Sequence, residues 1–385
     1  MDVMDATVET PPGFEALTEI GDAWSIAQPG LRARAVRERA PFLRERLEAT
    51  KPVVAVRTFD TMQLSYPTRY AFWGAAIVPS PFAIMTQRVF LVQFYQAGKL
   101  KNLLFNPTDP EGALRAPYLE RLRARHPILS RLSTRIFAPL TSQLRKVGVA
   151  PEQIDYIAYD HFHLQDLRKH LGTHGSPEPV TFPSAELIAQ KQEWEAWDAL
   201  HPLQSPFYVR DGKRGVLENR VRLIDGDVLL GDGVMLVRTP GHSTGNQTLF
   251  LHTERGLVGV SENGVSADNW SPRESKIPGV AKRCKDQDLD VLLNLDTPES
   301  GADQYTSMLL ERAMVDPVPE RPEFVQMVTG FEVTRSMLAP GISPTYYFGG
   351  FSVGSLWTGP ARAAANAAAP HAPGWGGGEL VGGAA

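Results

Sequence analysis

Cysteine is nearly absent from the sequence: Cys284 is the only one among 385 residues. A disulfide bond within the chain is therefore excluded, and a metal site would have to use histidine, aspartate or glutamate ligands. Basic residues are not in excess either, because 39 Lys and Arg stand against 43 Asp and Glu, a net charge of −4. Such a balance does not favour a nucleic-acid-binding surface, which is normally basic.

Two further absences concern membranes and secretion. The N-terminal segment is acidic and lacks the charged stretch followed by an apolar run that marks a secretory signal. No later stretch reaches the roughly 18 uninterrupted apolar residues that a membrane-spanning helix needs. We therefore expect a soluble cytoplasmic protein whose partner is a small molecule, with no role for nucleic acid or membrane. The oligomeric state cannot be read from the sequence.

The apolar content of 43% is enough for one main domain, and the β-prone runs place this domain over residues 52–357. Residues 1–51 form an N-terminal extension, in which 31–50 is rich in Arg, Glu, Leu and Ala and is predicted to be helical. Pro41 should begin, end or kink a helix there. This extension would cap a pocket, mediate a dimer or complete the core.

Short β-prone runs separated by helical segments make up the main domain. The strand predictions are VVAVR (53–57), RVFLVQF after Gln87, KNLLF (101–105), IDYIAYD (154–160), VRLID, VMLVR, QTLFL and GLVGVS. Helices are predicted in GALRAPYLERLRARHPILSRL and at 185–200. This mixture indicates layered α and β structure rather than a helical bundle.

The stretch DHFHLQDLRKH, residues 160–170, directly follows one of these strands. If the chain stays extended, His161 and His163 lie on one side and can converge on one ion. Asp166 follows three residues later, and His170 would share its face if a helix begins there. Neutral imidazole and carboxylate are suitable ligands for Zn²⁺.

A second histidine lies in a stretch rich in turn-forming residues, TPGHSTGNQTL (239–249). Pro240, Gly241 and Gly245 force a tight turn between two strands. The turn would hold His242 out from the backbone, where it could join the other histidines.

These two motifs, in this order, resemble those of the metallo-β-lactamase-fold hydrolase superfamily. IDYIAYDHFHLQD is similar to the family's strand leading into His-x-His-x-Asp-His, and TPGHSTGNQTLFL to its Thr-Pro-Gly-His-Thr-x-Gly segment. Residues 182–197 resemble a stretch that lactonase-like members carry between the motifs, so the likeness covers about 155–262. It implies an αββα sandwich of two mixed β-sheets flanked by helices, with one or two metal ions at one edge.

The resemblance also implies a set of metal ligands. His161 and His163 match the family's first two ligands, and His242 matches the third. An acidic bridging ligand is expected at the end of the next strand, where Glu262 in GLVGVSENG lies nearest. Because Glu is one methylene longer than the usual Asp, the site would be slightly wider.

The sequence departs from the family pattern after the second histidine. The family's Asp-His pair should fall on positions that hold Gln165 and Asp166 here. An amide cannot act as a general base. Either the loop bulges by one residue, so that Asp166 serves as a ligand and as the acid–base group, or the second metal position is altered.

The family's last histidine is also absent, because no His occurs between His252 and His371. The region where it would be expected, 341–350, offers Tyr346 and Tyr347 instead. A phenol could donate a hydrogen bond to a substrate, but its pKa near 10 makes it a poor routine zinc ligand.

Other polar residues could belong to the site or be ordinary structural residues. Asp160 could orient an imidazole, or simply end a strand. The remaining candidates are His170, His174 and the loop formed by Asp268, Asn269 and Trp270.

The resemblance implies a metal-dependent hydrolase with one or two Zn²⁺ ions. Three imidazoles would hold zinc with a position left for water, whose lowered pKa provides hydroxide to attack an ester, lactone or thioester carbonyl. Asp166 would orient that water and transfer its proton to the leaving group. Two alternatives stay open: an iron-dependent redox member of the same fold, and a non-catalytic member with a decayed metal site.

Residues 358–385 are dominated by Ala, Gly and Pro and are predicted to be a disordered tail, with His371 outside any site. Deleting residues 360–385 should leave the melting temperature and the metal content unchanged, because such a composition offers few core contacts. Differential scanning calorimetry and elemental analysis check this. A marked fall in melting temperature would show that the segment docks onto the domain.

Overall fold

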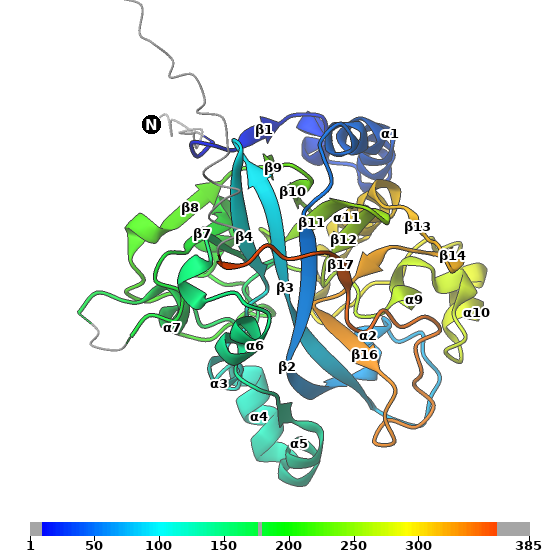
Figure 1. Cartoon of the computed structure of the whole chain (residues 1–385). Coiled ribbons are helices and arrows are strands. Elements are labelled where there is room, and N and C mark those ends of the chain that lie inside the picture. The colour runs from blue at the N-terminus through cyan, green and yellow to red at the C-terminus, as the bar shows by residue number, and fades with distance from the viewer. Residues whose placement is uncertain (1–9, 176–178, 360–385) are drawn as a thin grey trace, which may run out of the picture.

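The computed structural model describes residues 10–175 and 179–359. Two β-sheets lie face to face with helices on their outer sides (Figure 1). Almost all of the predicted tail, including His371, lies outside the described residues. The division into 1–51, 52–357 and 358–385 stays a prediction.

The first sheet has six strands in the order β1-β9-β10-β11-β12-β15. Its strands pair antiparallel except β12 with β15, which are parallel. Their bounds are β1 Glu15–Leu17, β9 Asp227–Gly231, β10 Val234–Arg238, β11 Gln247–Thr253, β12 Gly256–Val260 and β15 Met327–Val328.

The second sheet has nine strands, with the path β17-β2-β3-β4-β6-β7-β8, while β16 pairs with β3 and β5 with β2. From β4 to β8 the strands are parallel, so their carboxyl ends reach the same edge. Their bounds are β2 Ala55–Pro67, β3 Phe82–Gln96, β4 Lys99–Phe105, β5 Arg135–Ile136, β6 Tyr156–Ala158, β7 Glu186–Gln190, β8 Val221–Ile224, β16 Phe331–Thr334 and β17 Ser352–Gly354. A separate hairpin joins β13 Pro317–Val318 to β14 Arg321–Val325.

Helices cover both outer faces, which confirms the predicted αββα sandwich. α1 Pro29–Glu48 and α11 Gly301–Met314 cover the first sheet, and α6 Leu140–Lys146, α7 Arg168–Leu171 and α8 Lys191–Ala196 lie over the second. The other helices are α2 Thr68–Ala71, α3 Pro110–Ala113, α4 Pro117–Arg125, α5 Pro127–Ser133, α9 Ala267–Trp270 and α10 Val280–Asp286. In the described residues, no helix combines the length and apolar character that crossing a membrane requires.

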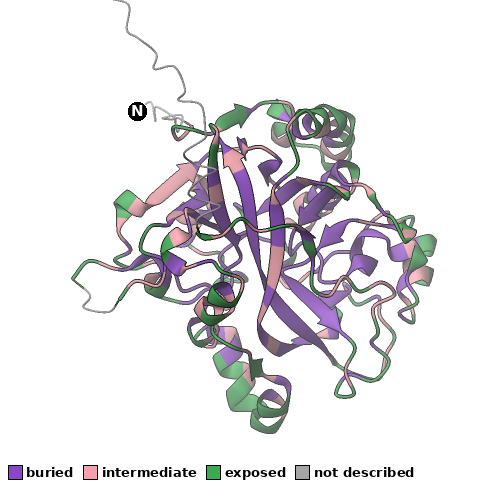
Figure 2. Cartoon of the chain, in the orientation of Figure 1, coloured by how far each residue is buried: buried purple, intermediate pink, exposed green. Residues whose placement is uncertain are grey.

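The alternation of side chains along β3 shows how the layers form. Phe90, Val92 and Phe94 pack between the sheets, whereas Val89 and Leu91 face the outer helical layer. Because successive side chains of a strand point to opposite faces, an uninterrupted apolar run supplies both interfaces. Figure 2 accordingly shows buried strands and exposed outer helix surfaces.

The strand predictions are confirmed, but the helix predicted over 185–200 is wrong in its first part. Residues Glu186–Gln190 form β7, and only Lys191–Ala196 are helical. β7 lies between β6 and β8, where Leu187, Ile188 and Ala189 are buried. A continuous apolar run fits a strand covered on both faces, and this tertiary burial decides the local structure.

The N-terminal segment completes the core of the first sheet, one of the three roles considered for it. β1 pairs with β9, and α1 packs against α11. α1 continues through Pro41, and its buried residues share one face: Val36, Ala40, Leu43 and Leu47.

Replacing Leu43 with Ala should lower the free energy of unfolding by about 2–5 kcal/mol, because it removes buried methyl groups between α1 and the first sheet. The neighbouring Phe42 is 58% exposed, so Phe42→Ala should change it by less than about 0.5 kcal/mol. Urea unfolding of the two variants tests this. Equal effects would mean that α1 does not belong to the core.

Candidate metal centre

The first histidine is held by the loop that leaves β6. The side chain of Asn106, which follows β4, accepts a hydrogen bond from the backbone N–H of Asp160 at 3.0 Å. Nδ1 of His161 lies 2.9 Å from Oδ1 of Asp160. With this nitrogen donating to the carboxylate, Nε2 is the atom left to face a metal. Asp160 therefore orients an imidazole, as one of its two readings from the sequence proposed.

The second histidine is fixed from the other side. Nε2 of His163 lies 2.5 Å from Oε1 of Gln204, so its Nδ1 is the nitrogen left for a metal. Nε2 of Gln204 also donates to the backbone carbonyl of His242, at 2.9 Å. One amide thus connects the two histidine motifs.

The turn between β10 and β11 carries the third histidine and needs two glycines. Gly241 has φ +134°, and a Cβ there would lie 2.1 Å from the backbone nitrogen of Gln304 in α11. A Cβ at Gly245 would lie 2.1 Å from the backbone nitrogen of Glu193 in α8. The turn is therefore pressed against two helices, which places His242 beside the first motif.

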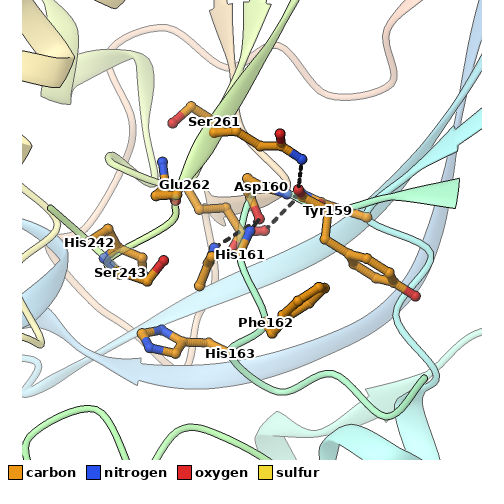
Figure 3. Close-up of polar contacts among 12 residues, drawn as sticks. Tyr159, Asp160, His161, Phe162, His163, His242, Ser243, Ser261 and Glu262 are labelled. Atoms are coloured by element: carbon orange, nitrogen blue, oxygen red, sulfur yellow. Dashed lines mark hydrogen bonds and ion pairs between the residues drawn. The ribbon is translucent and has the colours of Figure 1, made fainter. Parts of the chain in front are cut away.

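The three imidazoles converge (Figure 3). The ring centroids are 4.5 Å apart for His161 and His163, 4.6 Å for His161 and His242, and 4.9 Å for His163 and His242. One ligand atom from each lies within 4.8 Å of the others. Glu262, at the end of β12, forms a second such group with Asp160 and His161. Four of the five predicted site residues are thus brought together.

The electrostatics of this cluster suit a cation. Burial, followed by the neighbouring imidazoles, lowers the pKa of His161 and His163 well below the usual value, so both rings keep a free lone pair. Burial raises the pKa of Asp160, Glu262 and Asp296. A bound cation would relieve the cost of burying these carboxylates.

One unpartnered atom supports the same conclusion. Nδ1 of His242 is buried and makes no hydrogen bond, although Oδ1 of Asp296 lies 3.4 Å away. Buried polar atoms are rarely left unpaired, so this nitrogen is a candidate metal-binding atom. Three imidazoles with a carboxylate nearby are a donor set that fits zinc or another divalent ion.

The structure does not bring Asp166 to this cluster, which corrects its expected place as ligand and general base. Leu164 has φ +63° and turns the chain after His163. The carboxylate of Asp166 is bound by the guanidinium groups of Arg115 and Arg168, with Oδ2 2.7 Å from Arg168 Nη2. It lines a separate cavity. The two arginines supply the positive charge that balances this carboxylate. The hypothesis of a one-residue bulge had expected the metal to do so.

Gln165 also turns away from the histidines. Its side-chain nitrogen donates to Oγ1 of Thr108 at 3.0 Å. Neither position that corresponds to the family's Asp-His pair therefore belongs to the histidine cluster.

The other candidate residues make structural contacts outside the histidine cluster. His170 is buried and stacks on Phe182 with a centroid distance of 5.2 Å, and His174 is exposed. Trp270 donates to buried Glu311 at 2.8 Å. The rest bond or stack elsewhere: Asp268 with Thr345, Asn269 with Leu292, Tyr346 with Phe324, and Tyr347 with Arg88.

Asn294 and Asp296 at the site were missed from the sequence. The side-chain oxygen of Asn294 accepts from the hydroxyl of Tyr66 at 2.7 Å, and its Nδ2 donates to the backbone carbonyl of Glu262 at 3.2 Å. The available signal was the run VLLNLD (291–296), apolar residues ending in polar ones, as before His161. Asn294 and Asp296 from this run line the pocket, whereas Tyr346 and Tyr347 do not.

An apolar pocket opens over the cluster. His161, His163, His242, Glu262 and Asp296 contribute polar groups to it. Its other walls are mostly hydrocarbon and aromatic: Leu64, Tyr66, Met85, Tyr118, Leu119, Leu164, Phe207, Val265 and Phe331. Apolar walls around a few convergent polar groups are typical of small-molecule sites.

The two-sheet sandwich, with a His-x-His loop and a Pro-Gly-His turn meeting at one edge, is the arrangement that the resemblance to the metallo-β-lactamase fold implied. Part of the chain's sequence is similar to known lactonases. It is 35% identical over 113 residues to an N-acyl homoserine lactonase of Bacillus thuringiensis, and 34% identical over 117 residues to one of Bacillus cereus. These matches cover 29% and 30% of this chain, and only 38% and 40% of those proteins.

No family model matches the chain. Among solved structures, a quorum-quenching N-acyl homoserine lactone lactonase aligns with 62% of this chain and 88% of its own, at 21% identity and a TM-score of 0.43. A probable metal-dependent hydrolase from Staphylococcus aureus aligns with 66% and 84%, at 13% identity and a TM-score of 0.46.

The surroundings of Asp166 lead to a prediction that separates it from the metal. Asp166→Asn should leave metal content unchanged, whereas Asp160→Ala should weaken metal binding about 10–100-fold by releasing the His161 ring. Equilibrium titration with Zn²⁺ measures both. Loss of zinc from the Asp166 variant would restore this residue to the ligand set.

Asp166→Asn should also change the pH dependence of stability. Burial alone would raise the pKa of Asp166, but the hydrogen bond and charge of Arg168 hold it below the usual value. Its stabilising effect is therefore present above the ordinary carboxyl pKa of about 4 and is lost as the pH falls through the lower folded-state value. Urea unfolding should show the variant less stable than wild type at pH 7 and the difference narrowing in acid.

Proposed function

We propose that this protein is a metal-dependent hydrolase that opens lactones or cleaves related esters. The observation that carries the proposal is the convergence of three buried imidazoles at an apolar pocket, with the carboxylate of Glu262 close to His161. Few arrangements of this kind serve packing alone, because burying so many polar groups is costly.

The proposed ligands are Nε2 of His161, Nδ1 of His163, an imidazole nitrogen of His242 and the carboxylate of Glu262. Zinc is the preferred ion for this set of nitrogen and oxygen donors. We infer one ion per chain rather than two, because Gln165 is bonded to Thr108 and Asp166 to two arginines. When bound, such an ion supplies Lewis acidity toward a carbonyl oxygen and lowers the pKa of water to about 7.

The protein's own groups would orient the reaction. Asp160 and Gln204 hold the rings of His161 and His163 in one orientation each. Asp296 lines the pocket beside His242, and its carboxylate is the group we propose to accept a proton from water and return it to the leaving oxygen. Asp296 thus takes the role that the sequence had suggested for Asp166.

The substrate proposal joins the pocket to the sequence relatives. The relatives are named as N-acyl homoserine lactonases, and the pocket here has hydrocarbon and aromatic walls above its polar floor. We propose a neutral lactone that carries an apolar acyl or alkyl group, with the ring at the histidines and the chain along the walls. The cytoplasmic location stays a prediction.

Replacing His242 with Ala tests the function. Wild-type protein should contain about one zinc ion per chain and open an N-acyl homoserine lactone. The variant should lose the metal, and its kcat/KM should fall at least about 10²-fold, because losing a ligand costs no less than losing an outer-shell partner. Elemental analysis and a proton-release assay measure the two effects.

His170→Ala is the matched control, since His170 is equally buried but lies outside the cluster. It should keep both zinc and activity. Iron in the wild-type protein together with no lactone opening would favour the redox alternative. Wild-type protein that binds no metal at all would favour a non-catalytic role and overturn the proposal.

A further inference from the structure

Glu193, in the first turn of α8, is 2% exposed and accepts four hydrogen bonds. Its Oε1 lies 2.9 Å from the backbone nitrogen of Phe162 and 2.5 Å from the hydroxyl of Tyr208. Its Oε2 lies 2.7 Å from the hydroxyl of Ser243 and 3.1 Å from the backbone nitrogen of Gly245.

The donors belong to the two segments that carry the candidate ligands. Phe162 lies between His161 and His163, and Ser243 directly follows His242. One oxygen of Glu193 therefore holds the first motif, and the other holds the second. A single carboxylate joins two parts of the chain that are about eighty residues apart.

The backbones around this contact fit it closely. A Cβ at Gly245 would lie 2.1 Å from the backbone nitrogen of Glu193, so the turn rests directly on the start of α8. Tyr208 also forms an isolated antiparallel bridge with His163, and their rings are 5.0 Å apart. The hydroxyl of Tyr208 thus ties the His163 backbone to the same carboxylate.

All four donors are neutral, and this explains why a carboxylate is needed here. A carboxylate has acceptors on both oxygens, whereas a glutamine amide has an acceptor on one side and two N–H donors on the other. At this position the NH₂ group of a glutamine would face the N–H and O–H donors that now bond one oxygen of the carboxylate. The charge is buried at a cost, which the four hydrogen bonds offset.

We propose that Glu193 is a positioning residue that sets the distance between the two histidine motifs before a metal binds. The inference rests on the proposed metal-dependent function but concerns how its ligands are preorganised. In its absence the segment with His161 and His163 and the turn with His242 would lose these links and keep others such as Gln204, so their separation would be less closely fixed. Metal binding would then have to restore their arrangement, and affinity would fall.

The test uses Co²⁺ as the probe, because binding can be followed by visible absorption without any substrate. Glu193→Gln should weaken Co²⁺ binding about 10–100-fold and change the shape of the Co²⁺ spectrum, which reports ligand geometry. The melting temperature of the metal-free protein, measured alongside, reports the general loss of stability.

Asp268→Asn is the matched control. Asp268 is also a fully buried carboxylate with neutral donors, namely the hydroxyl of Ser266 and the backbone N–H and hydroxyl of Thr345, and neither residue lies in the two histidine segments. This variant should lower the melting temperature but keep the Co²⁺ affinity and spectrum of the wild type. The contrast separates positioning from stability.

Wild-type affinity and spectrum in Glu193→Gln would overturn the inference and leave the proposed function intact. Wild-type protein that binds no Co²⁺ would instead count against the proposed function itself. If Glu193→Gln does not fold, Ser243→Ala and Tyr208→Phe each remove one donor from one oxygen. Smaller losses of Co²⁺ affinity in both would support the inference, and unchanged affinity in both would overturn it.

Discussion

The cost of burying polar groups at the edge of the sandwich governs the rest of the site. Three imidazoles and the carboxylates of Asp160, Glu262 and Asp296 are withdrawn from water there. Each needs a partner, because an unpaired polar atom in the interior costs more than a hydrogen bond gains. Asn106 illustrates the solution, since its Nδ2 lies 3.1 Å from Asp160 and 3.3 Å from Glu262.

The fold explains how distant segments meet at this edge. β4 and β6 are parallel, so Asn106 and Asp160 leave the second sheet side by side. The first sheet brings the turn after β10 and the end of β12 to the same place. Residues close together in the sequence could not form this group of buried polar side chains by themselves. Because the strands end at the same edge, the fold brings the side chains together at little additional cost in chain entropy.

The parts of this arrangement that follow local rules could be predicted from the sequence. Short β-prone runs closed by turn or polar residues identified the strands, and His161 and His163 lie together because they are two positions apart on an extended chain. The Pro-Gly-His turn placed His242 correctly between two strands. The helix predicted over 185–200 failed in part because burial between two parallel strands, and not local propensity, decided the conformation of residues 186–190.

The parts that depend on distant partners could not be predicted. Asp166 was an attractive ligand by spacing, but Arg115, about fifty residues earlier, provides its counter-charge. Gln204 and Glu193 have no motif of their own in a single sequence. Their roles arise only when the histidine motifs are folded against them.

The lining of the pocket has an electrostatic consequence for what the pocket can admit. Gln165 and Asp166 lie away from the histidine cluster beyond the turn at Leu164, and Leu164 itself lines the pocket over the cluster. Apart from the three imidazoles, no basic side chain is among the described residues that line this pocket. A pocket without lysine or arginine offers phosphate esters and other anions no guanidinium or ammonium partner, and it therefore favours uncharged molecules.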